Sequence, residues 1–246
     1  MNNKTFIIIP FFNKWQLTHA RLMEIYRHIP NSNVVLVDDA STEEDCQDGV
    51  AWWQKDMQQH GIHIRYFRNK QNKGFGESMN VGASVAIKHD ADRLIFLSND
   101  VQIFGDFVSQ ISLLLSDEVL KLVGGRIIDW DSGWNTVEHK GVKKTIPYCE
   151  GWLLACDVPV WNTLGGFDPI YSPYDFEDLD VSTKAIIENI KLVGLDSGLV
   201  QHMGGVTIRS VNPNREQITR RNREFYLAKW EDRWDEVFSN LENAQN

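Results

Sequence analysis

The sequence predicts an α/β fold, with an open, twisted and mainly parallel sheet flanked by helices. Two observations predict it. Short, almost wholly apolar runs recur in the first half of the chain, and amphipathic segments lie between them. Such runs are typical of parallel strands buried on both faces, and their alternation with helices is typical of this kind of sheet. At 246 residues and 42% hydrophobic content, the chain is long enough to bury a substantial core.

The predicted elements of the first half follow one another in a regular order. Strands are predicted at residues 6–9, 34–37, 62–67 and 94–97. A helix is predicted over residues 15–29, where Leu17, Leu22 and Ile25 recur mostly at helical spacing. A second helix is predicted over residues 42–59, because Thr42 is followed by acidic residues, which helix N-termini favour. Each helix is expected to connect two parallel strands.

The second half of the chain is less regular. Strands are predicted over residues 121–128, 148–156 and 191–195, with a turn at residues 130–134. A Gly-Gly-Phe-Asp turn precedes a helix predicted over residues 175–189, and the chain is polar and predicted to be helical from Pro213 onward. We therefore expect one large domain over residues 1–210 and a helical C-terminal tail over residues 211–246.

The charge balance disfavours general binding to polyanions. The formal net charge is -9 and the pI is about 5.3, whereas binding through phosphates needs a broad basic surface. Positive charge gathers in two stretches, which are either solvated surface or local phosphate-binding sites. They are Arg65, Arg68, Lys70 and Lys73, and Arg209, Arg215, Arg220, Arg221 and Arg223.

No segment of the sequence is predicted to cross a membrane. Pro10 interrupts the apolar run near the N-terminus, and no stretch reaches the roughly 18 apolar residues of a membrane span. Cys46, Cys149 and Cys156 form neither an even disulfide framework nor a paired metal motif. We therefore expect a soluble, cytoplasmic protein in a reducing compartment.

Polar residues follow each of the four predicted strands of the first half. In open α/β sheets the ligand crevice lies beyond the carboxyl ends of the strands. Carboxylates at this edge, with lysines nearby, suit a nucleoside diphosphate with a divalent cation. Turn and capping chemistry explains any one of these residues, but their coincidence at four strand ends favours a binding site. The residues are Pro10 and Asn13, residues 38–41, residues 69–76 and residues 98–100.

Two common phosphate-binding motifs are absent from the sequence. A dinucleotide-binding fold needs G-x-G-x-x-G directly after the first strand, where this chain has Pro-Phe-Phe-Asn at residues 10–13. No Walker A sequence occurs either. The predicted site is therefore of a different class from both.

Ordered motifs from about Phe6 to about Gly205 resemble the family 2 glycosyltransferases of the GT-A fold, which are inverting enzymes. The first predicted strand leads into P-x-x-N, and the second ends in the D-D-x-S of residues 38–41. Residues 72–82 are similar to the family's N-x-G-x-x-x-x-x-N-x-G element, and residues 165–168 and 177–180 resemble its G-G-F-D and E-D-x-D pair. The resemblance implies a nucleotide-binding half at about residues 1–102, and an acceptor half with a small sheet at about residues 103–210.

The resemblance implies a nucleoside-diphosphate sugar as the donor, with a UDP-sugar or a dTDP-sugar as the expected form. Asp39 would contact the nucleotide base, and residues 72–82 would begin the helix beneath the donor. The donor-binding candidates are Pro10, Asn13, Asp38, Asp39, Asn72, Lys73, Gly74, Asn80 and Asn99.

A divalent cation, Mg²⁺ or Mn²⁺, is the expected cofactor. Residues 98–100 sit where the family places its metal-binding D-x-D, and Asp100 matches the last position. Ser98 replaces the first carboxylate, so the metal is expected to depend more on water or on the diphosphate. His202 matches a histidine that approaches the metal or the diphosphate in some relatives, with a structural role as the alternative.

The resemblance makes Asp178 the general base, with Glu177 as a second catalytic candidate. Residues 177, 178 and 180 cannot all share one helix face, so one carboxylate can point into the cleft while others hold neighbouring structure. An acidic helix N-terminus favoured by the dipole could explain any one of the three. Trp152 and Asp180 are acceptor-side candidates, and Trp130 and Trp134 could also stack on a sugar ring or fill the core.

The predicted function is inverting transfer of a sugar from the donor to an acceptor hydroxyl. The acceptor could be a glycan, a lipid-linked sugar, a protein or a small molecule, and the acidic charge disfavours modified nucleic acid. Two alternatives belong to other classes. A sugar nucleotidyltransferase would need a glycine-rich loop after the first strand, which is absent. A non-catalytic nucleotide-sugar or glycan binding protein is compatible with Ser98, although Glu177, Asp178 and Asp180 argue against it.

Overall fold

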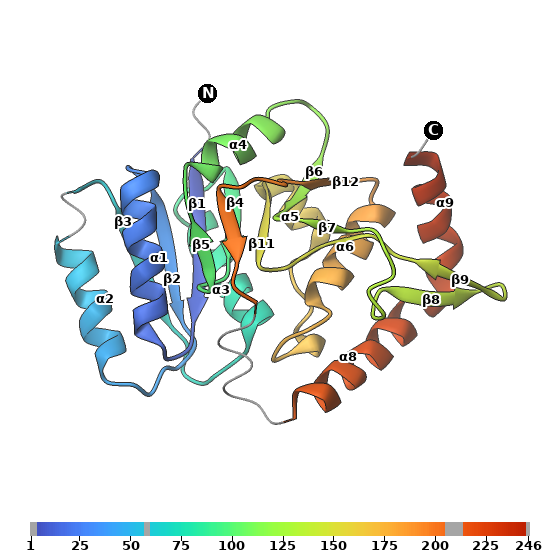
Figure 1. The fold of residues 1–246 in the computed structure, drawn as a ribbon, viewed down its shortest axis with the longest axis horizontal. Helices are drawn as coiled ribbons and strands as arrows, with labels where there is room; N and C mark the ends of the chain where they lie inside the picture. Colours follow the sequence, from blue (N-terminus) through green and yellow to red (C-terminus); the bar gives the residue numbers. More distant parts are fainter. Residues whose placement is uncertain (1–3, 57–59, 205–213, 245–246) are drawn as a thin grey trace.

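A seven-stranded sheet forms the centre of the computed structural model, which describes residues 4–56, 60–204 and 214–244 (Figure 1). The strand order is β12-β6-β11-β4-β1-β2-β3, and β11 alone runs antiparallel to its neighbours β4 and β6. The predicted mainly parallel α/β sheet is confirmed. The strands are β1 (Thr5–Phe11), β2 (Asn33–Asp38), β3 (His63–Arg68), β4 (Arg93–Leu97), β6 (Lys121–Gly124), β11 (Leu153–Asp157) and β12 (Lys191–Gly194).

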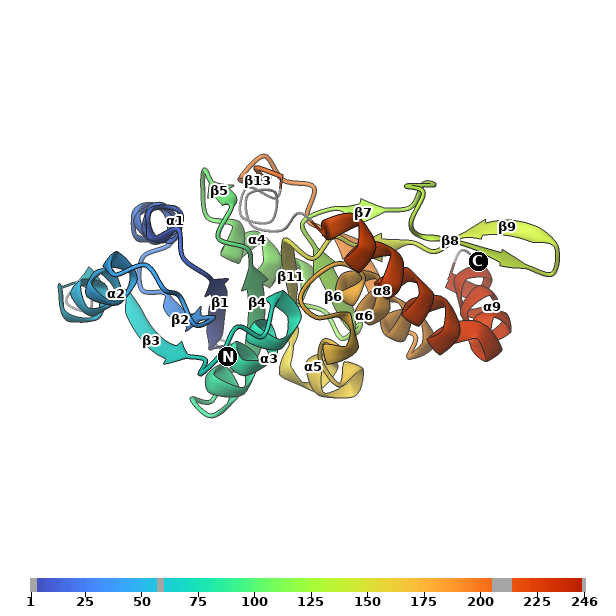
Figure 2. The same ribbon diagram turned by 90° about the horizontal axis from the view of Figure 1, so that it is seen from below.

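Helices cover both faces of this sheet, because successive side chains of its central strands point to opposite faces. Ile7 and Ile9 of β1 lie in a core with α1, α2 and α4, whereas Phe6 and Ile8 lie in a second core with α3, α5 and α6. Figure 2 shows α1 and α4 on one side of the strands and α3 and α5 on the other. The helices are α1 (Trp15–His28), α2 (Asp45–Asp56), α3 (Phe75–Ile87), α4 (Phe107–Leu114), α5 (Val158–Leu164) and α6 (Glu177–Ile187).

Close packing of α3 on the sheet depends on Gly82. A Cβ atom at this position would lie 2.3 Å from Cγ2 of Ile8 and 3.2 Å from Cγ2 of Val37. The last glycine of the 72–82 element therefore permits α3 to approach β1 and β2 closely.

Two strands predicted as continuous are interrupted. The segment predicted at residues 121–128 ends at Gly124 and resumes as β7 (Ile127–Ile128), and the Trp152 ring occupies the space beside Gly125. The segment predicted at residues 148–156 divides into β10 (Tyr148–Cys149) and β11. β10 pairs with β7, while β11 joins the main sheet, so one predicted strand serves two sheets.

Two predicted helices begin later than expected. α2 begins at Asp45 because Oδ1 of Asn13 accepts hydrogen bonds from the backbone amides of Thr42 and Glu43. α6 begins at Glu177 because Asp175 and Phe176 have φ values of 70° and 81°, which a right-handed helix excludes.

The C-terminal helices pack on the second half of the chain. Tyr226, Trp230 and Trp234 form a third core with residues of α6 and with Val137 and Ile146. This core joins α8 (Arg215–Trp230) and α9 (Trp234–Ala244), with the 3₁₀ helix η3 (Glu231–Arg233) between them, to the rest of the fold. The predicted helical tail is confirmed, whereas the boundary predicted near residue 210 lies outside the described residues.

Small antiparallel pairs complete the fold, as predicted for the second half. β8 (Thr136–His139) pairs with β9 (Val142–Thr145), and β5 (Val101–Ile103) pairs with β13 (Val200–His202). A further 3₁₀ helix, η2 (Pro169–Tyr171), precedes α6. Among the described residues, no helix is both long and apolar enough to cross a bilayer.

Candidate functional site

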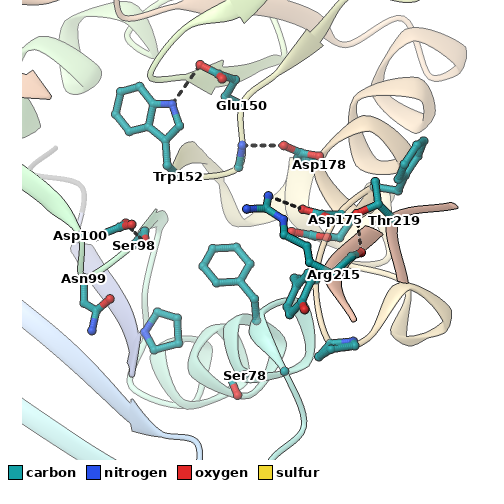
Figure 3. Close-up of a pocket in the computed structure, with 18 of the residues that line it drawn as sticks. Ser78, Ser98, Asn99, Asp100, Glu150, Trp152, Asp175, Asp178, Arg215 and Thr219 are labelled. Atoms are coloured by element: carbon teal, nitrogen blue, oxygen red, sulfur yellow. Dashed lines mark hydrogen bonds and ion pairs between the residues drawn. The ribbon is translucent and has the colours of Figure 1, made fainter. Parts of the chain in front are cut away.

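A cavity of about 1030 Å³ opens beyond the carboxyl ends of β1 and β4, and residues of both halves of the chain line it. Figure 3 shows Asp100 and Asp178 on opposite sides of it. The predicted residues that line this cavity are Pro10, Asp39, Asn72, Gly74, Asn99, Asp100, Trp134, Trp152, Glu177, Asp178 and His202. Residues far apart in the sequence thus meet at this edge of the sheet, where the polar residues that follow the strands predicted a binding site.

Asp39 ties together the loops on the nucleotide side of the cavity. Its carboxylate accepts hydrogen bonds from the side chain of Asn69 and from the backbone amides of Lys73 and Gly74, at 2.8, 2.8 and 2.9 Å. Gly74 has a φ of 86°, and a Cβ atom there would lie 2.5 Å from the backbone of Pro173. Glycine is therefore required for this loop to pack against the wall of the cavity.

Three predicted donor-binding residues brace this side of the site from outside the cavity lining. Asn13 holds the start of α2, and Asp38 accepts hydrogen bonds from the Ser41 amide and the Tyr66 hydroxyl. Asn80 accepts a hydrogen bond from the Phe167 amide and donates one to the Phe167 carbonyl, at 2.9 and 2.7 Å. The asparagine of α3 therefore fixes the Gly-Gly-Phe-Asp turn.

In the first basic stretch, Arg68 and Lys73 make contacts within the protein. Arg68 binds Asp38 at 3.5 Å and the Ser41 carbonyl at 2.7 Å, and the Lys73 ammonium lies 3.9 Å from Glu77. The Lys73 side chain is not part of the cavity lining. In the second stretch Arg215 lines the cavity, while Arg209 lies outside the described residues.

Asp100 and His202 meet because β5 and β13 are paired, with His202 opposite Val101 in the register. Nε2 of His202 lies 3.3 Å from Oδ1 of Asp100, and the Ser98 hydroxyl donates to the same oxygen at 2.5 Å. The Trp152 ring stacks on the His202 ring, with 5.5 Å between the centroids and 12° between the planes. This stacking fixes the imidazole beside the carboxylate.

The Asp100 and His202 pair fits part of a divalent-cation site. A carboxylate oxygen and an imidazole nitrogen are both metal ligands, and 3.3 Å is a separation at which they can share one ion. Of the described residues, no other Asp, Glu, His or Cys joins them in a group of three. A cation here would therefore need further ligands from water or a diphosphate, as expected from Ser98.

Asp178 lies on the other side of the cavity, in the first turn of α6. Oδ2 accepts a hydrogen bond from the Gly151 amide at 2.9 Å, and Oδ1 accepts one from the Leu179 amide at 2.8 Å. Burial raises the pKa of Asp178 to about 6, against the lowering effect of these two amides. The Asp178 carboxyl group therefore loses its proton at a higher pH than an ordinary aspartic acid.

Glu177 is 7% exposed, and its Oε2 atom has no hydrogen-bond partner among the residues that the structure describes. Burial, with the nearby charge of Asp178, raises the pKa of Glu177 well above its usual range. The two neighbouring carboxyl groups therefore titrate as a pair.

Asp180 is fully buried and is absent from the cavity lining. Its carboxylate accepts hydrogen bonds from the Tyr171 hydroxyl at 3.1 Å and the Trp230 indole at 3.0 Å, and it forms ion pairs with Lys229 and Lys184 at 2.9 and 3.4 Å. The last carboxylate of the Glu-Asp-Leu-Asp motif therefore joins α6 to α8.

Several lining residues were absent from the predicted site. Arg215 and Thr219 of α8 both bind Asp175, at 3.3 and 2.6 Å, and the three lie together in Figure 3. Glu150 accepts hydrogen bonds from Arg126 and from the Trp152 indole, at 2.8 and 3.0 Å. The basic stretch containing Arg215 was visible in the sequence, but its contact with a loop 40 residues earlier was not.

Comparison with known proteins identifies relatives of this chain. A family model described as glycosyl transferase family 2 matches residues 6–162. A curated relative, the dTDP-rhamnosyl transferase RfbF of Shigella flexneri, is 25% identical over 85 residues, which are 33% of this chain and 29% of the relative.

Two solved structures have a similar fold. The mannosyltransferase PcManGT from Pyrobaculum calidifontis, in complex with GDP-Man and Mn²⁺, matches with a TM-score of 0.60 and 18% identity over 79% of this chain and 55% of that one. TarS of S. aureus matches with a TM-score of 0.57 and 16% identity over 80% of this chain and 36% of that one. The chain thus spans less than two thirds of the length of each of these three proteins.

Proposed function

The chain belongs to glycosyl transferase family 2, and from this membership we propose that it transfers a sugar from a nucleoside-diphosphate sugar to an acceptor hydroxyl, with inversion at the anomeric carbon. One observation carries the proposal. A carboxylate with a raised pKa, Asp178, faces the Asp100 and His202 pair across a single cavity. Inversion needs a base on the side of the incoming hydroxyl and stabilisation of the departing diphosphate on the opposite side.

Asp178 is the general base in this proposal. An alcohol is far less acidic than a carboxylic acid, so Asp178 takes the acceptor proton as the new C–O bond forms and not before. The Gly151 and Leu179 amides hold the carboxylate in place for this transfer. The C–O bond to the diphosphate breaks in the same step, and the electron pair leaves with the nucleoside diphosphate.

Asp100 and His202 are the proposed ligands of Mg²⁺ or Mn²⁺. When bound, such a cation would supply Lewis-acid stabilisation of the diphosphate. Ser98 and Trp152 orient the two ligands. The presence of Mn²⁺ in the mannosyltransferase complex supports a divalent cation as the cofactor.

Donor binding is assigned to the half at residues 1–102 and acceptor binding to residues 103–210. Asp39 and Gly74 line the cavity in the first half and Asp178 lines it in the second. A dTDP-sugar or UDP-sugar is the proposed donor, and the names of two relatives, which include dTDP-rhamnosyl and GDP-Man, support a nucleotide sugar.

Thermal unfolding with uridine, thymidine, guanosine and cytidine diphosphates, each with and without Mn²⁺, tests the donor site. A nucleotide at one hundred times its dissociation constant stabilises the fold by about 2.7 kcal/mol, which is readily measured. We expect a shift for one nucleotide that grows with metal. No shift with any nucleotide would contradict the proposal, while binding without transfer to any acceptor would favour a non-catalytic binding protein.

Replacing Asp100 with Ala is expected to weaken metal-dependent nucleotide binding by at least about 10–100-fold, which is the range found even for groups that only support metal ligands. Titration of the nucleotide with and without Mn²⁺ measures the effect. Asp90→Ala is a suitable control, because its side chain is 94% exposed on a loop away from the cavity. If Mn²⁺ increased the nucleotide affinity of Asp100→Ala as much as that of the unaltered protein, Asp100 would not be a ligand of the metal.

Transfer is expected to rise with pH through about 6 and to level off above it. The pKa of Asp178 is raised to about 6, and a general base works only when it is deprotonated. Initial rates between pH 5 and 8 at saturating donor measure this profile. Nucleotide binding over the same range separates this effect from any loss of donor binding, and a flat rate profile would exclude Asp178 as the titrating base.

A further inference from the structure

The side of the cavity that carries Asp178 indicates which acceptor it fits. We call this the acceptor wall and define it by the lining residues Trp134, Tyr148, Glu150, Asp175, Glu177 and Asp178. The inference rests on the proposed function, because it concerns the sugar that receives the transferred residue.

Trp134 is a large aromatic side chain that is held at the cavity without being buried. It is 46% exposed, yet the loop that carries it is fixed by Asn135, which is fully buried. The Asn135 amide donates to the carbonyls of Trp130 and Ile146 at 3.1 and 2.9 Å and accepts from the Ser132 amide at 3.0 Å. An exposed indole on a rigid loop is a preorganised surface for an apolar ligand face.

Trp134 and the proposed base lie at the same cavity. Trp134, Tyr148 and Asp178 all line it. Burial, with the nearby charge of Asp178, also raises the pKa of Tyr148. The exposed indole and the proposed base therefore face one cavity.

Four of the six residues that define the acceptor wall carry carboxyl groups. They are Glu150, Asp175, Glu177 and Asp178. Carboxylate oxygens accept hydrogen bonds, and sugar hydroxyl groups donate them. The wall is therefore suited to a ligand that presents hydroxyl groups.

In the described part of the chain, the basic side chains at or beside the acceptor wall are paired with acidic ones. Arg215 is the one Arg or Lys among the described residues of the lining, and it binds Asp175 at 3.3 Å. Arg126, next to the wall, binds Glu150 at 2.8 Å. A carboxylate or phosphate on the acceptor would therefore lose its hydration and meet carboxylates, which is unfavourable.

We propose that the acceptor is an uncharged sugar ring, which stacks its C–H face on Trp134 and donates hydroxyl hydrogen bonds to the carboxylates of the acceptor wall. The ring receives the new glycosidic bond through the hydroxyl that reaches Asp178. Acceptors with a phosphate or a carboxylate on that ring are expected to bind more weakly, because the described basic side chains at the wall are paired with acidic ones.

Saturation-transfer NMR with the full chain, UDP or dTDP and Mg²⁺ tests this proposal without requiring transfer. The probes are neutral methyl hexopyranosides, each matched with its uronide and its 6-phosphate. We expect ring C–H signals for neutral glycosides and affinities at least about tenfold lower for the anionic partners. Trp134→Ala should abolish the signals. Trp130→Ala is the matched control, because Trp130 belongs to the same loop and is 50% exposed but does not line the cavity.

Three results would overturn the proposal: anionic glycosides that bind as well as neutral ones, signals that survive Trp134→Ala, or no binding of any neutral glycoside. Signals from the nucleotide ribose in the same samples report on the donor site. Absence of the ribose signals would contradict the proposed transferase function, whereas the glycoside signals test the acceptor assignment. The two proposals are therefore tested separately.

Discussion

Asp178→Asn is expected to lower kcat for sugar transfer by about 10²–10⁴-fold, the usual contribution of a general base. The amide cannot take the acceptor proton, so the step in which the C–O bond forms loses its proton acceptor. Asn has nearly the same shape as Asp and can still accept a hydrogen bond from the Gly151 amide, which donates to Oδ2 in the structure. Donor affinity is therefore expected to remain close to that of the unaltered protein, because Asp178 and the Asp100 side lie across the cavity from each other.

Transfer kinetics at saturating donor, together with nucleotide titration, measure both parts of this expectation. Glu188→Gln is the matched control, since Glu188 is exposed and follows the last residue of the same helix. It should leave kcat and donor affinity unchanged. Full transfer activity in Asp178→Asn would assign the base to another group, and Glu177 would be the first to examine because it precedes Asp178 and lines the same cavity.

The sequence predicted the sheet well because the strands of the first half are buried on both faces. Runs such as residues 6–9 and 34–37 have no polar side, so they are distinguished from amphipathic helices without knowledge of their neighbours. The same logic predicted the site edge, since polar residues directly after buried strands gather at one end of a parallel sheet. Asp39, Asn99 and Asp100 line the cavity for this reason.

The second half was predicted less well because its structure depends on contacts between distant residues. The strand predicted at residues 148–156 divides because β10 pairs with β7 and β11 pairs with β4 and β6. Local hydrophobicity does not contain this information. Arg215 and Thr219 likewise reach the cavity only because α8 packs along the loop that carries Asp175.

Asp180 illustrates the same limit within one motif. The sequence predicted that the carboxylates at 177, 178 and 180 would divide between the cleft and structural roles. The structure places residues 177 and 178 at the cavity and residue 180 in a buried contact with α8. That division depends on Trp230 and Lys229, which are about 50 residues away in the sequence and gave no signal of the contact.

Asp180→Ala is expected to lower the free energy of unfolding by about 3–5 kcal/mol, the usual cost of removing one partner from a buried ion pair. Asp180 is fully buried, and its loss leaves the Lys229 ammonium, the Tyr171 hydroxyl and the Trp230 indole without this acceptor. Because these groups hold α8 against α6, the third hydrophobic core is weakened together with the ion pairs. Denaturant unfolding followed by circular dichroism measures the change.

Two further variants make this expectation specific to the buried network. Asp180→Asn should lose less stability than Asp180→Ala, because its carbonyl oxygen can still accept from Trp230 or Tyr171 while the negative charge is gone. Asp235→Ala is the surface control, since Asp235 pairs with Lys140 and His139 with its side chain 70% exposed, and its unfolding midpoint should not change. Equal midpoints for Asp180→Ala and Asp235→Ala would show that the carboxylate of the motif contributes no more than a surface ion pair, and the anchoring of α8 would then be assigned to its apolar contacts alone.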